Sequence, residues 1–350
     1  MIFSMRTIFW DYDTSSVALI EQSLLPDEFK VIKCSTIEEL ADAIKRLAVR
    51  GAPALEAAGA YGIALAAHQI DYRDVEELKN FLRKAAKFLS STRPTAVNLF
   101  YGIDRVLNAA LKGKTVEEIK NIALSEAEKI ADEDVVRNKL IGSFGAKLLE
   151  DGDTVLTYCN TGRLATVDWG TALGVVRSAI KEGKEIKVIA CETRPLNQGS
   201  RLTTWELMQD GIDVTLITDS MAGIVMQRHM VDKVIVGADR IVRDAVFNKI
   251  GTYMVAILAK EHGIPFFVAA PKTTFDWSRN MEDVTIEERN RDELIYCHIK
   301  CKKSLIAPKD VKVFNPAFDA TPLKYVTALI TDKGVIFPPY EENVPKTLKF

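Results

Sequence analysis

The sequence predicts an α/β protein in which a helical N-terminal domain precedes a doubly wound parallel sheet. Its 350 residues are enough for two domains. Up to about residue 150, apolar residues recur at the spacing of three and four that is typical of helices. From residue 151 onward, short β-branched runs alternate with helical patterns. Nearly continuous apolar strands separated by helices are typical of a parallel sheet covered on both faces.

The N-terminal domain is expected over residues 1–125, with a connecting helix over 126–150. After a β-like start at residues 5–14, helical patterns cover 35–51, 74–89, 95–111 and 115–150. Ser35 with Glu38 fits a capping box, Gly51 follows the last turn, and Asp74 is the expected N-cap of the second pattern. Pro53 opens a further helix that is rich in Ala and Gly.

The sheet domain is expected over residues 151–350. Its predicted strands are 154–159, 186–192, 213–219, 232–239, 265–271 and 326–331. The segments between them are long enough for crossover helices, for example 171–184 and 251–263. Right-handed crossovers then give an open sheet whose ligands bind at the carboxyl ends of the strands.

Composition argues against several partners and locations. The net charge of −2 provides no basic field for nucleic acid or an anionic membrane. No apolar run approaches the ~20 residues that a membrane span needs, and no signal peptide is expected at the N-terminus. The five cysteines are scattered and include no CxxC pair, which favours a reducing compartment and hence a cytoplasmic protein.

Polar residues directly follow four of the predicted strands. They are Cys159-Asn160, Glu192-Thr193-Arg194, Asp219-Ser220 and Asp239-Arg240. These residues either cap the following helices or line a pocket, and their recurrence at one edge favours the pocket. Cys159 is either an inert small hydrophobe or a reactive thiol, because "CNTG" is interpreted as a helix N-terminus that stabilises a thiolate.

Other ligand sites receive less support. No GxxxxGK[ST] loop is present and no GxGxxG follows a strand, so ATP and NAD are disfavoured. Anion binding is instead suggested by Arg50 and Gly51 before the Pro53 helix, by Arg93 before Pro94, and by Asn248-Lys249 before another helix. Cys297, His298 and Cys301 supply only three ligands, so a metal site is disfavoured.

With these pieces in place, the sequence resembles the methylthioribose-1-phosphate isomerase family of methionine salvage. The superfamily also contains ribose-1,5-bisphosphate isomerase and the α, β and δ regulatory subunits of the translation-initiation exchange factor. The matching stretches span most of the chain and include "VRGAPA", "RPTAVNL", "TYCNTGRLAT", "ETRPLNQGSRLTTWEL", "VTLITDSMAG", "VIVGADRI", "NKIGTY" and "NPAFDATP". The resemblance implies a helical domain followed by a Rossmann-like domain, usually in a homodimer.

The resemblance also implies an activity and a set of site residues. The reaction is the conversion of 5-methylthioribose 1-phosphate to the 1-phosphorylated ketose, without metal or organic cofactor. Cys159 and Asp239 match the two catalytic positions. The substrate-contacting positions are matched by Arg50, Gly51, Ala52, Arg93, Gln198, Asn248 and Lys249.

Two other functions remain open from the sequence. Ribose-1,5-bisphosphate isomerase also uses Cys and Asp but needs a second phosphate site. A regulatory subunit, which binds a sugar phosphate or an initiation factor, is expected to lack the catalytic pair, whereas Cys159 and Asp239 are both present here. Arg163 and Ser220 depart from the usual family pattern, and 5-deoxyribose 1-phosphate is a further candidate substrate.

Overall fold

The computed structural model describes residues 5–94, 96–299 and 302–350, which form two compact units. The helical unit runs up to Lys139 and includes Gly162–Gly170, and the sheet unit contains Leu140–Thr161 and the chain from Thr171 onward. No sequence pattern indicated that Gly162–Gly170 leaves the sheet unit. Among the described residues, no helix combines the length and apolarity needed to cross a membrane.

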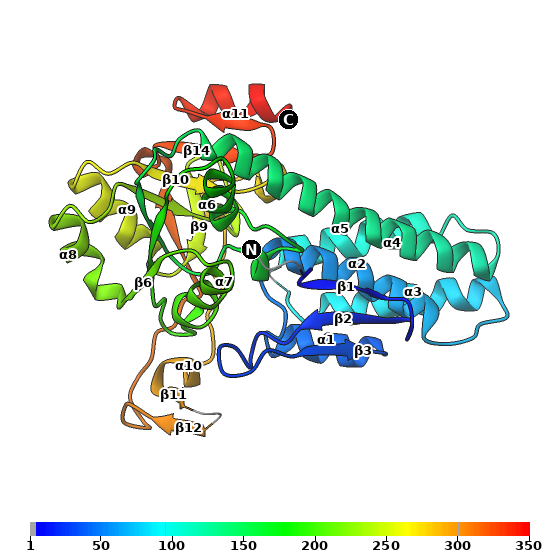
Figure 1. Cartoon of the computed structure of the whole chain (residues 1–350). Helices are drawn as coiled ribbons and strands as arrows, with labels where there is room; N and C mark the ends of the chain where they lie inside the picture. The colour runs from blue at the N-terminus through cyan, green and yellow to red at the C-terminus, as the bar shows by residue number, and fades with distance from the viewer. Residues whose placement is uncertain (1–4, 95, 300–301) are drawn as a thin grey trace. The chain divides into compact units, whose positions relative to one another are not determined.

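The helical unit contains five helices and a small antiparallel sheet in the order β1-β2-β3 among its described residues (Figure 1). Only the first of its three strands was predicted. The elements are β1 (Ile8–Asp11), β2 (Ser16–Ile20), β3 (Val31–Cys34), α1 (Ile37–Lys45), α2 (Ala52–His68), α3 (Val75–Ser90), α4 (Val97–Ala110) and α5 (Val116–Ala146), whose last turns belong to the sheet unit.

Local signals placed the helix starts to within one or two residues. The Asp74 carboxylate accepts the Glu77 N–H at 2.8 Å, which confirms the predicted N-cap of α3. The capping box of α1 was predicted one residue too early, because Thr36 and Glu39 form it. Arg93 does not lie before a Pro-started helix, since α4 begins at Val97.

Small residues bring α2 and α4 into backbone contact. A Cβ atom on Gly102 would lie 2.0 Å from the Glu56 carbonyl oxygen, and one on Gly59 would lie 2.6 Å from the Leu99 carbonyl oxygen. Only glycine therefore fits at these two positions. The Ala- and Gly-rich composition of α2 is explained by this close packing.

The sheet unit confirms the predicted α/β fold. Its main sheet has the order β15-β14-β10-β7-β4-β5-β6, and all the pairs except β14–β15 are parallel. The six predicted strands are present as β4 (Thr154–Thr157), β5 (Lys187–Cys191), β6 (Val214–Ile217), β7 (Lys233–Val236), β10 (Phe266–Ala269) and β14 (Ala328–Thr331). The predicted crossover helices are α6 (Ala172–Lys181), α7 (Thr204–Gln209), α8 (Ala222–Gln227) and α9 (Thr252–Glu261).

Alternate residues of these strands pack into separate apolar clusters. Val155 belongs to the cluster that includes α6 and α7, and Leu156 to the cluster that includes α8, α9 and α11 (Tyr340–Leu348). The sheet is therefore covered on both faces, which is why its strands are apolar throughout. The unpredicted strands are β8 (Arg240–Ile241), β9 (Ala245–Lys249), β11 (Tyr296–Ile299), β12 (Lys302–Leu305), β13 (Phe318–Pro322) and β15 (Gly334–Ile336).

The stability of the helical unit is expected to fall with rising pH because of Asp134. This fully buried carboxyl accepts the Val167 N–H at 2.7 Å, and burial raises its pKa to about 7. Between about pH 4 and pH 7, Asp134 therefore keeps its proton in the folded state but loses it in the unfolded state. The stabilisation that Asp134 provides is full below about pH 4 and is lost as the pH rises to 7. Asp134→Asn should gain stability relative to the parent chain by up to ~4 kcal/mol across this window.

Denaturant unfolding at pH 5 and pH 8 measures this gain, with Glu133→Gln as the matched control. Arg105 holds the pKa of Glu133 below its ordinary value. The contribution of Glu133 to the free energy of unfolding is therefore lost only at lower pH and stays constant between pH 5 and pH 8. Equal pH dependence in Asp134→Asn and the parent chain would contradict the assignment.

Candidate active site

The sheet reverses its strand order between β4 and β7. From β4 the chain proceeds through β5 to β6 in one direction, and from β7 through β10 to β14 in the other. Cys159 follows β4 by two residues and Asp239 follows β7 by three residues. Loops that leave a parallel sheet at such a point diverge and open a crevice, which is the usual ligand site of this architecture.

The segments that follow β4 and β7 touch each other. Leu156 is in register with Val234, and the Thr157 hydroxyl donates to the Ile235 carbonyl at 2.8 Å. A Cβ atom on Gly237 would lie 2.4 Å from the Thr161 methyl carbon, so the absence of a side chain there lets the two segments meet. The structure thus places Cys159 and Asp239 on neighbouring loops at one edge of the sheet.

Cys159 is 5% exposed and has a left-handed backbone with φ of 68°. Its N–H donates to the Thr193 hydroxyl at 2.9 Å, and its carbonyl accepts from the Thr203 hydroxyl at 2.8 Å. The predicted helix directly after "CNTG" was wrong, because only a single 3₁₀ turn forms at Arg163–Ala165 and α6 begins at Ala172. The helix-dipole argument for Cys159 therefore does not apply.

Asp239 leads into the small antiparallel sheet β13-β9-β8. It is half-buried, and its N–H donates to the Phe247 carbonyl at 2.9 Å. The middle strand β9 carries Asn248 and Lys249 at its end, where they pair with Asp319 and Phe318 of β13. This small sheet, which the sequence did not predict, brings Asp239 and the Asn248-Lys249 pair onto one subdomain.

Asn248 and Lys249 are both buried, at 2% and 7% exposure. The Lys249 ammonium donates to the Ala317 carbonyl at 2.9 Å and lies 5.1 Å from the centre of the Phe318 ring. Asn248 donates to the Thr252 hydroxyl at 3.0 Å at the start of α9. A cation and an amide are thus held at fixed positions beside a helix start, as anion binding requires.

Asp319 organises the turn that follows this pair. Its carboxylate accepts the Gly251 N–H at 2.7 Å and the Tyr253 N–H at 3.2 Å, and burial raises its pKa to about 6. Gly251 has φ of 104°, and a Cβ atom there would lie 2.1 Å from the Tyr158 hydroxyl. The residue before Cys159 is thereby packed against the turn after Lys249.

The loop after β5 contributes buried polar atoms. Asp219 accepts the N–H groups of Thr193 at 2.8 Å and Arg194 at 2.7 Å, so it supports this loop rather than capping a helix. Gln198 is 7% exposed, and its Oε1 has no hydrogen-bond partner among the described residues. The Asn197 Oδ1 and Thr161 Oγ1 atoms share this property. Buried polar atoms of this kind are suited to ligand hydroxyl groups.

The four remaining predicted site residues lie in the helical unit. Arg50, Gly51 and Ala52 form the start of α2, where Gly51 has φ of 97° and a Cβ atom would lie 2.4 Å from the Ala165 carbonyl oxygen. Arg93 is half-buried. No side-chain hydrogen bond caps the start of α2, so the anion-binding prediction for its backbone N–H groups stays a prediction.

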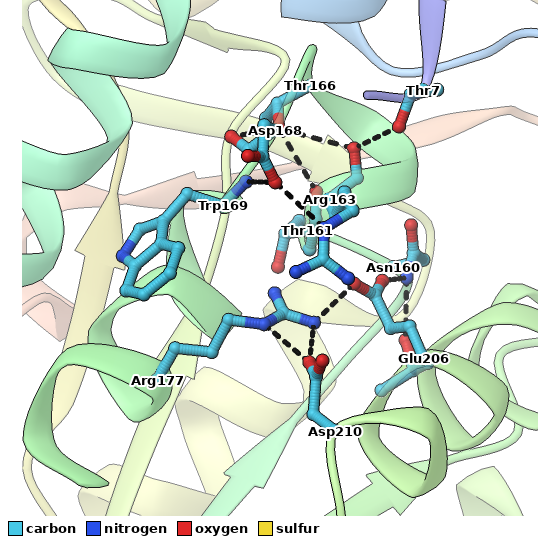
Figure 2. Close-up of polar contacts among 12 residues, drawn as sticks. Thr7, Asn160, Thr161, Arg163, Thr166, Asp168, Trp169, Arg177, Glu206 and Asp210 are labelled. Atoms are coloured by element: carbon cyan, nitrogen blue, oxygen red, sulfur yellow. Dashed lines mark hydrogen bonds and ion pairs between the residues drawn. The ribbon is translucent and has the colours of Figure 1, made fainter. Parts of the chain in front are cut away.

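The two departures from the family pattern differ in their surroundings. Arg163 is buried in the helical unit, and its Nε donates to the Asp168 carboxylate at 2.8 Å (Figure 2). Its charge therefore has an acidic partner. Ser220 is exposed and its hydroxyl lies 3.0 Å from that of Thr218.

Among the described residues, no group of three or more His, Cys, Asp or Glu side chains is arranged to hold a metal ion. Cys301, one of the three residues considered as ligands, lies outside the described residues.

Comparisons with known proteins cover nearly the whole chain. The family described as "Initiation factor 2 subunit family" matches residues 48–338. A methylthioribose-1-phosphate isomerase of Carboxydothermus hydrogenoformans is 52% identical over 346 residues, which is 98% of both chains. The crystal structure of 5-methylthioribose 1-phosphate isomerase from Pyrococcus horikoshii OT3 has 47% identity and a TM-score of 0.92, over 99% of this chain and 97% of that one.

A second solved structure carries a different name. The crystal structure of the translation initiation factor eIF-2B, subunit delta, from A. fulgidus is 72% identical, with a TM-score of 0.91 over 99% of this chain and 100% of that one.

Gly251→Ala should destabilise the sheet unit through the Tyr158 contact. Alanine there would combine backbone strain with a clash, and overpacking of this kind typically costs about 1–3 kcal/mol beyond the strain. Gly183→Ala is the matched control, because Gly183 has φ of 95° and nothing within 4 Å of a Cβ atom. Denaturant unfolding of both variants measures the difference, and equal losses would contradict a role for the contact.

Proposed function

This chain belongs to the Initiation factor 2 subunit family. We propose that it is a member of the isomerase branch of that family and converts 5-methylthioribose 1-phosphate to 5-methylthioribulose 1-phosphate. The observation that carries the proposal is the placement of a thiol and a carboxyl on neighbouring loops at the switch point of the sheet. Relatives that share about half of its residues over the full chain are named for this activity.

Asp239 and Cys159 are the proposed catalytic residues. An aldose with phosphate on its anomeric oxygen must open its ring before hydrogen moves from C2 to C1. Asp239 donates a proton to the ring oxygen as the bond between that oxygen and C1 breaks. The hydrogen then reaches C1, the proton of the 2-hydroxyl is released, and C2 becomes the carbonyl carbon.

The thiolate of Cys159 acts on this hydrogen transfer in one of two ways. In the first, it removes the C2 proton, the C–H electron pair forms a double bond to C1, and a proton is returned to C1. In the second, hydride moves directly from C2 to C1 and the thiolate stabilises the cationic centre. Deuterium incorporation at C1 in D₂O identifies the first route, and full retention of hydrogen is the expected result for the second.

The remaining proposed residues bind the substrate. Lys249 and Asn248 are buried beside a helix start, and Gln198 presents an acceptor without a partner among the described residues, as a phosphate and a hydroxyl group require. Arg50, Gly51, Ala52 and Arg93 are proposed as further substrate contacts on the resemblance alone. No step of the proposed reaction is assigned to a metal or an organic cofactor.

A regulatory role is the second candidate, and the name of the A. fulgidus structure favours it. The two roles differ in turnover. A binding subunit would bind the sugar phosphate without converting it, whereas the presence of both Cys159 and Asp239 supports conversion. The proposal also includes a cytoplasmic location, in keeping with the five scattered cysteines, which include no CxxC pair.

We expect the purified chain to isomerise methylthioribose 1-phosphate faster than 5-deoxyribose 1-phosphate or ribose 1,5-bisphosphate. Cys159→Ser and Asp239→Asn should each lower kcat at least about a hundred-fold, since each removes a group that acts on a proton or a charge in the reaction. Cys297→Ser is the control, because Cys297 lies on the separate β11–β12 hairpin. Undiminished turnover in either active-site variant, with its fold intact, would refute the catalytic assignment.

We also propose that the chain forms a homodimer through an apolar face on α8, α9 and the edge strand β6. Six large apolar side chains on these elements and on the 3₁₀ turn before α8 are 38–49% exposed. The helices α8 and α9 pack against each other (Figure 1). The six side chains are Leu216, Met221, Ile224, Tyr253, Met254 and Ile257. Exposed large apolar side chains on neighbouring elements are typical of an interaction site.

In sedimentation experiments, the parent chain should have twice the mass of a single chain. The double variant that combines Ile224→Asp and Ile257→Asp should have the mass of a monomer. Val136→Asp is the control, since Val136 is 57% exposed on α5 outside this face. A monomeric parent chain, or a dimer that persists in the double variant, would contradict the proposed interface.

A further inference from the structure

The backbone of Cys159 is held on both sides by threonine hydroxyls. Thr193 lies in the loop after β5 and accepts the Cys159 N–H, whereas Thr203 precedes α7 and donates to the Cys159 carbonyl. These two bonds fix a left-handed conformation that costs a non-glycine residue about 1 kcal/mol or more. A conformation of this cost persists only where the surroundings impose it.

Thr203 is in turn held by a buried amide. The Asn160 Nδ2 donates to the Thr203 hydroxyl at 3.2 Å and to the Glu206 carboxylate at 2.5 Å. Because Asn160 donates to the Thr203 oxygen, the hydroxyl proton of Thr203 is directed to the Cys159 carbonyl. The orientation of this hydroxyl is therefore determined by its two neighbours.

A fully buried ion cluster anchors the far end of this chain of contacts. The Arg177 guanidinium of α6 donates to the Glu206 carboxylate at 2.7 Å and to the Asp210 carboxylate at 2.7 Å (Figure 2). The side chains of Arg177 and Asp210 are 0% exposed and that of Glu206 is 1% exposed. Replacing such a cluster with apolar residues is often neutral or stabilising, so its presence points to a role in fixing geometry.

We propose that Thr203 is a positioning residue for Cys159, with Asn160 and Glu206 holding it in place. The φ angle of Cys159 determines the direction of its Cα–Cβ bond, and with it the position of the sulfur. Loss of the Thr203 hydroxyl lets the backbone of Cys159 relax toward the β region, and this moves the Cys159 sulfur away from the substrate carbon. A displacement of about 1 Å is enough to lower a rate by roughly a hundred-fold.

The inference deepens the proposed function and rests on it for its kinetic test. Thr203→Val removes the hydroxyl while keeping the shape of the side chain, and Thr203→Ser keeps the hydroxyl. We expect Thr203→Val to lower kcat by about 10- to 100-fold with KM within about two-fold of the parent value, and Thr203→Ser to restore kcat. A change confined to KM, or no rescue by serine, would overturn the positioning role.

A second measurement does not depend on turnover. Iodoacetamide alkylation, read by mass spectrometry on the peptide that contains Cys159, reports how firmly its loop is held. Thr203→Val should raise the alkylation rate of Cys159 at least about three-fold, because a loosened loop exposes the buried thiol more often. Thr203→Ser should leave that rate at the parent value.

The two measurements separate the inference from the proposed function. A parent chain without isomerase activity refutes the proposed function, while faster alkylation in Thr203→Val still supports the positioning of Cys159. Parent-like kcat and parent-like alkylation in Thr203→Val would overturn the inference. Should Thr203→Val fail to fold, the pair Thr193→Val and Thr193→Ser tests the opposite side of the same backbone by the same two readouts.

Discussion

The parallel pairing of β4 with β7 is the constraint on which the rest of the candidate site depends. The bond from Thr157 to the Ile235 carbonyl fixes the register at the end of the two strands. A shift by one residue would exchange the faces of β4 and move Val155 and Leu156 into each other's apolar cluster, so the close packing of the two clusters also fixes this register. The positions of the loops that carry Cys159 and Asp239 follow from the packing of the core.

The polar groups around these loops make the site costly to assemble and therefore well defined. Arg177, Glu206 and Asp210 lose their hydration, and their mutual bonds offset that loss only in one arrangement. Asp319 is held by two backbone N–H groups although burial opposes its charge. Side chains held this firmly need little reorganisation when a substrate binds, which is the condition under which fixed dipoles and charges accelerate a reaction.

The fold was largely predictable from the sequence because its strands and helices follow local rules. Each of the six apolar runs of the main sheet forms a strand, and Asp74 caps α3 as its spacing indicates. The small sheet of β8, β9 and β13 was missed because β8 has only two residues and because β13, the other partner of β9, begins at Phe318, far along the chain from β9. The candidate site was predictable only in part. Thr203 and Glu206 gave no local signal, since their importance depends on a left-handed φ at Cys159 that no sequence pattern specifies.

The overall fold does not by itself distinguish an isomerase from a regulatory subunit. Solved structures that carry either name match this chain over almost all of its length with nearly the same TM-score. One fold often supports both catalysis and binding, so the distinction has to come from individual side chains. A subunit that only binds needs a cavity with suitable donors, whereas a catalytic thiol also has to be held at a defined position by its backbone. Strained residues cluster at active sites, where they hold a reacting group in position, and the strain at Cys159 therefore favours the isomerase.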